Sequence, residues 1–167
     1  HKLVKAKSKV SLNAIKTYLK SEEKNPILKS ILIQKMLEEK WNESLEIHKF
    51  SRKCRVQLNE LYKPFEDGTV AKVMAILSDR IENENPTLYE FSRQLWSDVV
   101  MAIYPFSLPT YDIYVLAASI HYKSSELNGF STSVESVAQL YYVPLEQLED
   151  AINEITTVIM SLSQLKE

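Results

Sequence analysis

The side chains that could carry acid–base or metal chemistry are few, and their spacing does not suit it. His48 and Cys54 stand six positions apart with no second histidine or cysteine nearby, whereas a metal site needs three or four ligands. The acidic pairs at 22–23 and 38–39 are adjacent residues, which point about 100° apart on a helix and do not converge on one substrate. No Ser/His/Asp or Cys/His arrangement can be identified. We therefore expect no catalytic residue, no metal or cofactor, and no enzymatic activity.

Lysine and arginine side chains offer a different chemistry, contact with phosphate. The densest basic cluster consists of Lys49, Arg52, Lys53 and Arg55, with the aromatic Phe50 inside it. A second group lies near the start of the chain and includes Lys5, Lys7 and Lys9. Phosphate contacts of this kind would make nucleic-acid binding steeply salt-dependent. The alternatives are a solvated face or a contact with the acidic part of the same chain.

The charge is divided unevenly along the sequence. Residues 1–63 carry 15 Lys and Arg against 7 Asp and Glu, whereas residues 64–167 carry 5 against 15. The change falls at 63–69, where a Pro and an Asp-Gly pair indicate a turn or short linker. We expect a basic region over 1–63 and an acidic one over 69–167. The two regions pack against each other, or face different partners, or have exposed helix faces that simply differ in composition.

Composition excludes several function classes. The chain of 167 residues is long enough for one average domain or two small ones. Two glycines cannot supply a P-loop, a dinucleotide fingerprint or a nucleophile elbow, and one cysteine cannot form an internal disulfide. No apolar run reaches membrane-spanning length, and no signal peptide is recognisable. These features favour an intracellular protein, nuclear in a eukaryote and cytoplasmic in a prokaryote.

Hydrophobic periodicity predicts an all-α protein. Asn25-Pro26 and Asn85-Pro86 have the residue types of a helix cap followed by the first helical position. The segment 113–120 is apolar nearly all round, which is typical of a helix buried on every side. His121 is expected to be a core histidine. The predicted helices lie near 10–20, 26–41, 43–52, 56–63, 69–83, 86–104, 110–124, 132–141 and 144–165.

Within residues 109–155 this apolar segment is followed by two sequence patterns typical of helix starts. They run from Thr132 to Ala138 and from Val143 to Leu148. The order resembles the last three helices of a cyclin-box repeat of the transcription factor IIB type, in which a central helix precedes a short helix and a longer final one. The resemblance spans about residues 69–160. It implies a cyclin-like repeat with a buried central helix. A weaker resemblance over residues 1–63 implies an incomplete second repeat of the same kind. The alternative is that this region is an unrelated helical extension.

The sequence departs from that family where its members meet DNA. The final helix carries Glu146, Glu149, Asp150 and Glu154, which would repel phosphate, and Tyr141-Tyr142 replaces a small residue in the preceding turn. The resemblance therefore implies a fold more than an activity.

The remaining candidates are residues for contact with a protein partner. The segment 104–109 links two predicted helices and carries aromatic side chains, which either lie at an interface, where such residues are common, or fold back over the core. Ile159 and Leu162 extend beyond the usual end of a cyclin-like repeat. The predicted partner-binding residues are Trp96, Tyr104, Phe106, Ile159 and Leu162. We expect an adaptor in transcription or another DNA-linked process that binds a protein partner, with nucleic acid on its basic part. The alternative is a cyclin-like regulator or scaffold that binds protein alone.

Overall fold

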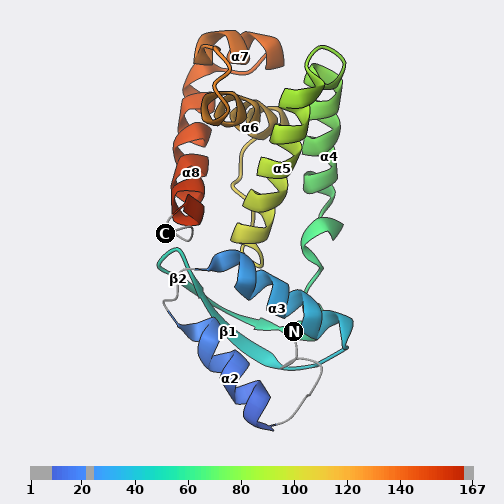
Figure 1. Ribbon diagram of the computed structural model, residues 1–167. Coiled ribbons are helices and arrows are strands. Elements are labelled where there is room, and N and C mark those ends of the chain that lie inside the picture. The colour runs from blue at the N-terminus through green and yellow to red at the C-terminus, as the bar shows by residue number, and fades with distance from the viewer. Residues whose placement is uncertain (1–8, 22–24, 164–167) are drawn as a thin grey trace.

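The computed structural model describes residues 9–21 and 25–163, and these form two units stacked end to end (Figure 1). The N-terminal unit contains α2 (Lys9–Lys20), α3 (Pro26–Glu38) and the strands β1 (Ser44–Lys49) and β2 (Arg52–Gln57). Single helical turns at Leu58–Glu60 and Pro64–Glu66 lead to the second unit. Asn25 caps α3 as predicted, accepting a hydrogen bond from the Leu28 amide at 2.9 Å.

The helices predicted over 43–52 and 56–63 are wrong, because this region forms an antiparallel hairpin. Ser44 to Lys49 alternate exposed or half-exposed side chains with buried ones, and the buried members are Leu45, Ile47 and Lys49. The third inward-facing residue, Lys49, is polar. The alternation of inward and outward side chains is therefore not visible as an alternation of apolar and polar residues in the sequence. The weaker resemblance of residues 1–63 to a cyclin-like repeat depended on these two helices and therefore loses its support.

The hairpin turns through only two residues, Phe50 and Ser51, and both have left-handed backbone conformations with φ of 51° and 60°. Two positive φ values in succession match the right-handed twist of the strands, which is why Asn-Gly is the usual sequence for such a turn. The turn is therefore built from residues that do not favour it, and the expected sequence signal is absent.

The second unit is wholly helical over its described residues and begins at the predicted change of charge. Its helices are α4 (Gly68–Leu77), which continues into a π-helical turn (Ser78–Glu82), α5 (Pro86–Ile103), α6 (Ile113–Leu127), α7 (Val134–Tyr141) and α8 (Leu145–Ser163). Asn85 caps α5, accepting from the Leu88 amide at 3.0 Å. The five helices predicted after residue 69 are confirmed.

The helix α6 is the centre of this unit. It contacts α4, α5, α7 and α8, and Val115 to His121 are all buried (Figure 1). At the start of α6, Ile113 is half-buried and Tyr114 has 40% of its surface exposed. His121 is buried as expected, and its Nδ1 lies 2.8 Å from the hydroxyl of Tyr141 on α7. Burial lowers the pKa of His121 to about 4.

The apolar core has two parts. One lies within the five-helix unit and includes Trp96, Leu116 and Leu148. The other joins α2, α3 and the hairpin, and it also takes in Tyr104 from the end of α5. The helix α5 thus reaches down to the N-terminal unit, where it contacts α3 (Figure 1). This contact positions the features described next.

Candidate functional site

Lys49 joins the hairpin to the C-terminal end of α5. Its side chain is buried, and its ammonium donates to the carbonyl oxygens of Ala102, at 3.2 Å, and of Tyr104. The same ammonium lies 2.5 Å from Oγ of Ser30 on α3. Carbonyl groups at a helix C-terminus lack partners within the helix and attract a positive charge. Lys49 therefore satisfies the end of α5 while holding it against α3 and β1.

The position of Lys49 corrects the prediction that it binds phosphate, because its ammonium is directed inward. Burial, followed by the nearby charge of Lys29, lowers the pKa of Lys49 to about 7. Lys29 is itself buried and donates to the carbonyls of Ser21 and His48, at 2.5 and 2.7 Å. Two lysines of the basic region thus bind backbone carbonyls inside the protein.

Beside this contact lies an open groove of about 630 Å³, here called the junction groove. The hairpin tip forms one wall, the segment between α5 and α6 forms the floor, and α8 forms the other wall. The side chains that define it are Phe50, Arg52, Phe106, Tyr111, Glu154 and Val158. The basic and acidic parts of the sequence both line this groove.

Arg52 and Phe106, which were predicted to serve different partners, are in contact at this groove. The guanidinium carbon of Arg52 lies 4.9 Å from the centre of the Phe106 ring, within the range of a cation–π interaction. Arg52 remains exposed at the hairpin tip, whereas Phe106 is half-buried. Arg52 therefore covers one side of the Phe106 ring while remaining exposed to solvent itself.

The α8 wall carries the opposite charge. Glu154 is exposed there and lines the groove together with Tyr111. Partial burial, and next the carboxylates of Glu154 and Asp150, raise the pKa of Tyr111. The groove accordingly presents a cation on its hairpin side, an anion on its α8 side, and apolar side chains between them.

Other predicted partner residues are less accessible than expected. Trp96 is a core residue with 1% of its surface exposed, and its indole N–H donates to the Val70 carbonyl at 3.1 Å. Tyr104 and Ile159 are buried, and Leu162 is half-buried. Trp96 and Tyr104 are thus corrected from surface anchors to packing residues, because α5 turns Trp96 inward and Tyr104, just after α5, packs into the core of the N-terminal unit.

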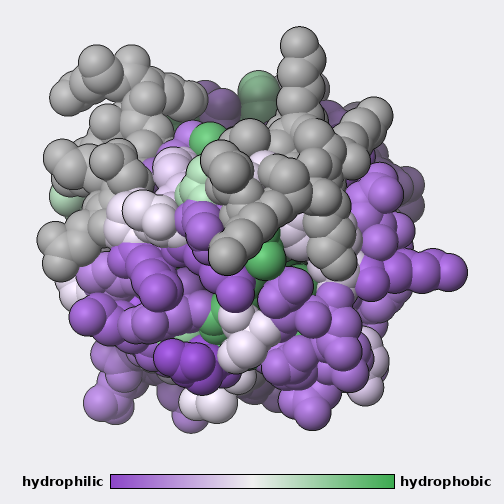
Figure 2. Space-filling view, turned by 90° about the horizontal axis from the view of Figure 1, so that it is seen from below, coloured by the Kyte–Doolittle hydropathy of each residue, from purple (hydrophilic) through white to green (hydrophobic). Residues whose placement is uncertain are grey.

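The predicted phosphate-binding residues do not act as one set. Lys53 and Arg55 are exposed on β2, and Arg55 lies 4.0 Å from Glu46 on the paired strand. Lys5 and Lys7 lie outside the described residues, and Lys9 begins α2 with its side chain outside that description. Seen from below the view of Figure 1, the visible surface is mainly hydrophilic (Figure 2).

Several residues of the junction groove escaped the sequence analysis. Phe50 was noted only as an aromatic inside a basic cluster, and Glu154 only as a charge unfavourable to DNA. The alternation Leu45, Ile47, Lys49 was the available signal for the hairpin that brings Phe50 to the groove. No sequence feature indicated that α8 would form the opposite wall.

Two classes of site find no support within the described part of the chain. Residues 9–21 and 25–163 contain no group of three or more His, Cys, Asp or Glu side chains placed to hold a metal ion. None of their helices combines the length and the apolar character that a bilayer crossing demands.

Comparison with known proteins gives one informative similarity. No known protein family and no solved structure matches the chain. A protein of Bacillus subtilis (strain 168), the TPR repeat-containing protein YsoA, is 26% identical over 137 residues. The matched stretch covers 82% of this chain and 41% of that protein, so the chain spans less than half the length of the relative that it resembles.

Proposed function

We propose that this chain is a non-enzymatic adaptor that binds a segment of a protein partner in the junction groove. The observation that carries the proposal is the convergence of Arg52, Phe106 and Glu154, which come from three separate parts of the sequence, around one open apolar surface. Exposed aromatic and arginine side chains are the residue types that contribute most to protein interfaces. The name of the bacterial relative adds support, since TPR repeats build extended binding surfaces from helices.

The groove also defines the chemistry of its partner. A bound segment would place an apolar side chain against Phe106 and Val158, an acidic group near Arg52 and a basic group near Glu154. Opposite charges on two walls fix the orientation of a segment more than they increase its affinity. We therefore expect the partner to bind in a single direction.

The internal contacts of the basic region favour the reading in which protein alone is bound. Lys29 and Lys49 donate hydrogen bonds to backbone carbonyls, and Arg52 covers Phe106. Lys49 and Arg52 thereby link the basic unit to the acidic one. Of the predicted phosphate-binding residues whose side chains the structure describes, Lys53 and Arg55 are exposed and would remain for nucleic acid.

The cyclin-like relationship and a role in transcription or another DNA-linked process remain part of the proposal. Five helices in the expected order, with α6 enclosed by the others, support the fold component. The acidic surface of α8 argues against DNA contact by the last helix, so a protein partner is the simpler link to such a process.

Photo-crosslinking from within the groove tests the proposal. A benzophenone amino acid replaces Thr157, an exposed lining residue of α8, in the full chain, which is then irradiated in a lysate of cells that produce it. The matched control places the same group at Met160, which is 59% exposed on α8 but outside the groove. We expect a discrete protein adduct from position 157 that Arg52→Glu abolishes. Identical adducts from both positions would contradict the proposal.

A salt titration separates the two kinds of partner. The full chain is titrated with duplex DNA at low and at physiological salt, alongside a variant with Lys53→Gln and Arg55→Gln. If protein is the partner, both chains bind DNA weakly and alike. Binding that falls steeply with salt, and whose slope flattens in the variant, would instead assign the exposed face of β2 to nucleic acid.

A further inference from the structure

A second groove, separate from the junction groove, lies between α5, the end of α6 and the end of α8. It encloses about 620 Å³, and the start of α3 closes it at one side. The apolar lining consists of Ile27, Phe91, Leu95, Leu127, Ile159 and Leu162. We call it the α5–α8 groove.

Two of its apolar side chains are well exposed. Phe91 of α5 and Leu127 of α6 both line the groove, with 41% and 55% of their surfaces exposed. Exposed apolar groups gathered around a groove and bordered by polar ones are typical of binding surfaces. The polar border here includes Asn25, Gln94 and Asn128.

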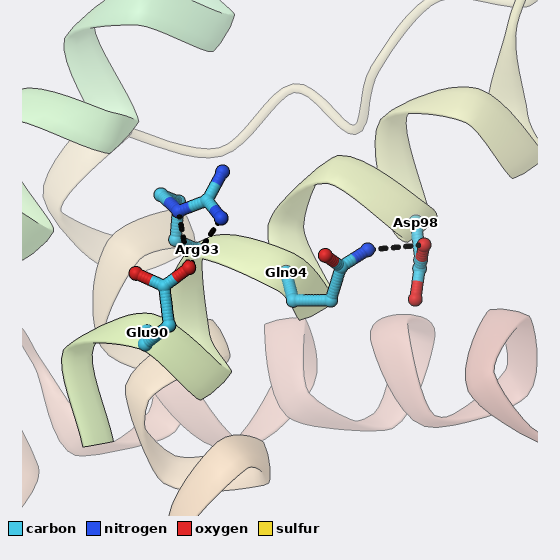
Figure 3. A network of polar contacts seen from close by, with 4 residues as sticks. All are labelled: Glu90, Arg93, Gln94 and Asp98. Atoms are coloured by element: carbon cyan, nitrogen blue, oxygen red, sulfur yellow. Dashed lines mark hydrogen bonds and ion pairs between the residues drawn. The ribbon is translucent and has the colours of Figure 1, made fainter. Parts of the chain in front are cut away.

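The charge within the groove has one sign. Asp98 is its only charged lining residue among those described, and it is half-buried. One carboxylate oxygen accepts a hydrogen bond from Gln94 at 3.1 Å, and the two side chains lie next to each other one turn apart on α5 (Figure 3). The nearby Arg93 is paired with Glu90 rather than with Asp98 (Figure 3). The carboxylate in the groove is therefore available to a cation from outside.

From these features we propose that the α5–α8 groove binds an amphipathic helix of another protein, whose apolar face carries one lysine or arginine directed at Asp98. The lining residues Phe91, Leu95 and Asp98 follow each other at helical spacing on α5, which matches a helical ligand laid along it. No strand edge borders the groove in the described part of the chain, so a ligand adding a strand is excluded there. This site is independent of the proposed function of the junction groove.

Selection from a displayed library of helical peptides about 15 residues long, with one face randomised, tests this proposal on the full chain. We expect the enriched peptides to carry apolar residues three and four positions apart with a single Lys or Arg. A parallel selection against Asp98→Arg should enrich Asp or Glu at that position. Enrichment of basic peptides by both chains, or of none by the wild type, would overturn the proposal.

Two leucine variants locate the bound peptides. Leu127→Gln alters the groove, whereas Leu140→Gln changes a leucine of α7 that is 41% exposed and does not line it. We expect Leu127→Gln to weaken the enriched peptides at least about tenfold and Leu140→Gln to leave them unchanged. Equal effects would place the peptides elsewhere and refute the assignment.

The same measurements identify other occupants. Sedimentation of the free chain as a dimer that Leu127→Gln dissociates would show that a second copy fills the groove, against the proposal. A shortened chain without residues 164–167 is tested in the same way. Stronger peptide binding by the shortened chain would show that these residues compete with the peptide for the groove. Absence of peptide binding by the shortened chain would refute the proposal.

Discussion

Lys49 donates a hydrogen bond to the carbonyl of Ala102, 3.2 Å away and 53 residues further along the chain. The contact joins the last position of β1 to the last turn of α5. It fixes the hairpin relative to the segment between α5 and α6, and so it sets the width of the junction groove. A residue expected to meet an external phosphate instead builds the surface to which we assign a partner.

The first prediction concerns the free energy that this contact contributes. Lys49→Met keeps most of the length of the side chain but removes the ammonium that donates to the carbonyls of Ala102 and Tyr104. Two effects oppose each other, because the variant also avoids burying a charge. Since three acceptors surround the ammonium, we expect the lost hydrogen bonds to prevail and stability to fall by about 2 kcal/mol. Urea unfolding measures the change.

Lys53→Met provides the control for this measurement. Lys53 lies on the adjacent strand with its side chain exposed, and the substitution is chemically the same. Its effect should stay within about 0.5 kcal/mol. Equal losses in the two variants would mean that lysine at position 49 has no special structural role.

The second prediction concerns the hairpin turn. Ser51 is exposed with φ of 60°, a conformation that glycine adopts without a steric cost. We expect Ser51→Gly to stabilise the protein by up to about 1 kcal/mol in thermal or urea unfolding. Ser107→Gly, at an exposed position without a positive φ, should destabilise it by a few tenths of a kcal/mol to about 1 kcal/mol. Destabilisation by both changes would contradict the left-handed assignment.

The third prediction concerns acid stability. Burial lowers the pKa of His121 from 6.5 to about 4, so the unfolded chain takes up a proton at a higher pH than the folded one. The stability that depends on neutral His121 is complete above pH 6.5 and is lost as the pH falls toward about 4. The loss should reach at most about 1.4 kcal/mol per pH unit.

His121→Gln isolates this contribution. The variant should lose stability less steeply than the wild type over that pH range in urea unfolding. His48→Gln, on the half-exposed side of β1, should leave the slope unchanged. A slope unaffected by His121→Gln would show that this histidine titrates normally in the folded protein.

The helices could be predicted where local sequence and tertiary packing agree. The caps at Asn25 and Asn85 and the apolar spacing of α8 are local features, and the structure confirms the helices that they predicted. The hairpin could not be predicted in this way. Its inward position at Lys49 is polar, and its turn, Phe50-Ser51, lacks the residues that normally favour two left-handed conformations.

The junction groove was recognisable only in part, because its walls come from segments about 50 residues apart. Sequence reasoning nominated Arg52 and Phe106 but assigned them to different partners. It also treated Trp96 as a surface anchor, although its side chain lies on the buried face of α5. In each case the residue type indicated which contacts the side chain can make. Its burial determined whether it makes them inside the protein or at the surface.

The last prediction tests that distinction at Trp96. Trp96→Phe removes the hydrogen bond to the Val70 carbonyl and leaves that buried acceptor without this donor. We expect stability to fall by about 1–3 kcal/mol, while photo-crosslinking from position 157 stays as in the wild type wherever the chain is folded. An interface anchor would behave in the opposite way, with unchanged stability and a lost adduct. Because only one of the two measurements can change under each role, the pair decides whether Trp96 supports the core or meets the partner.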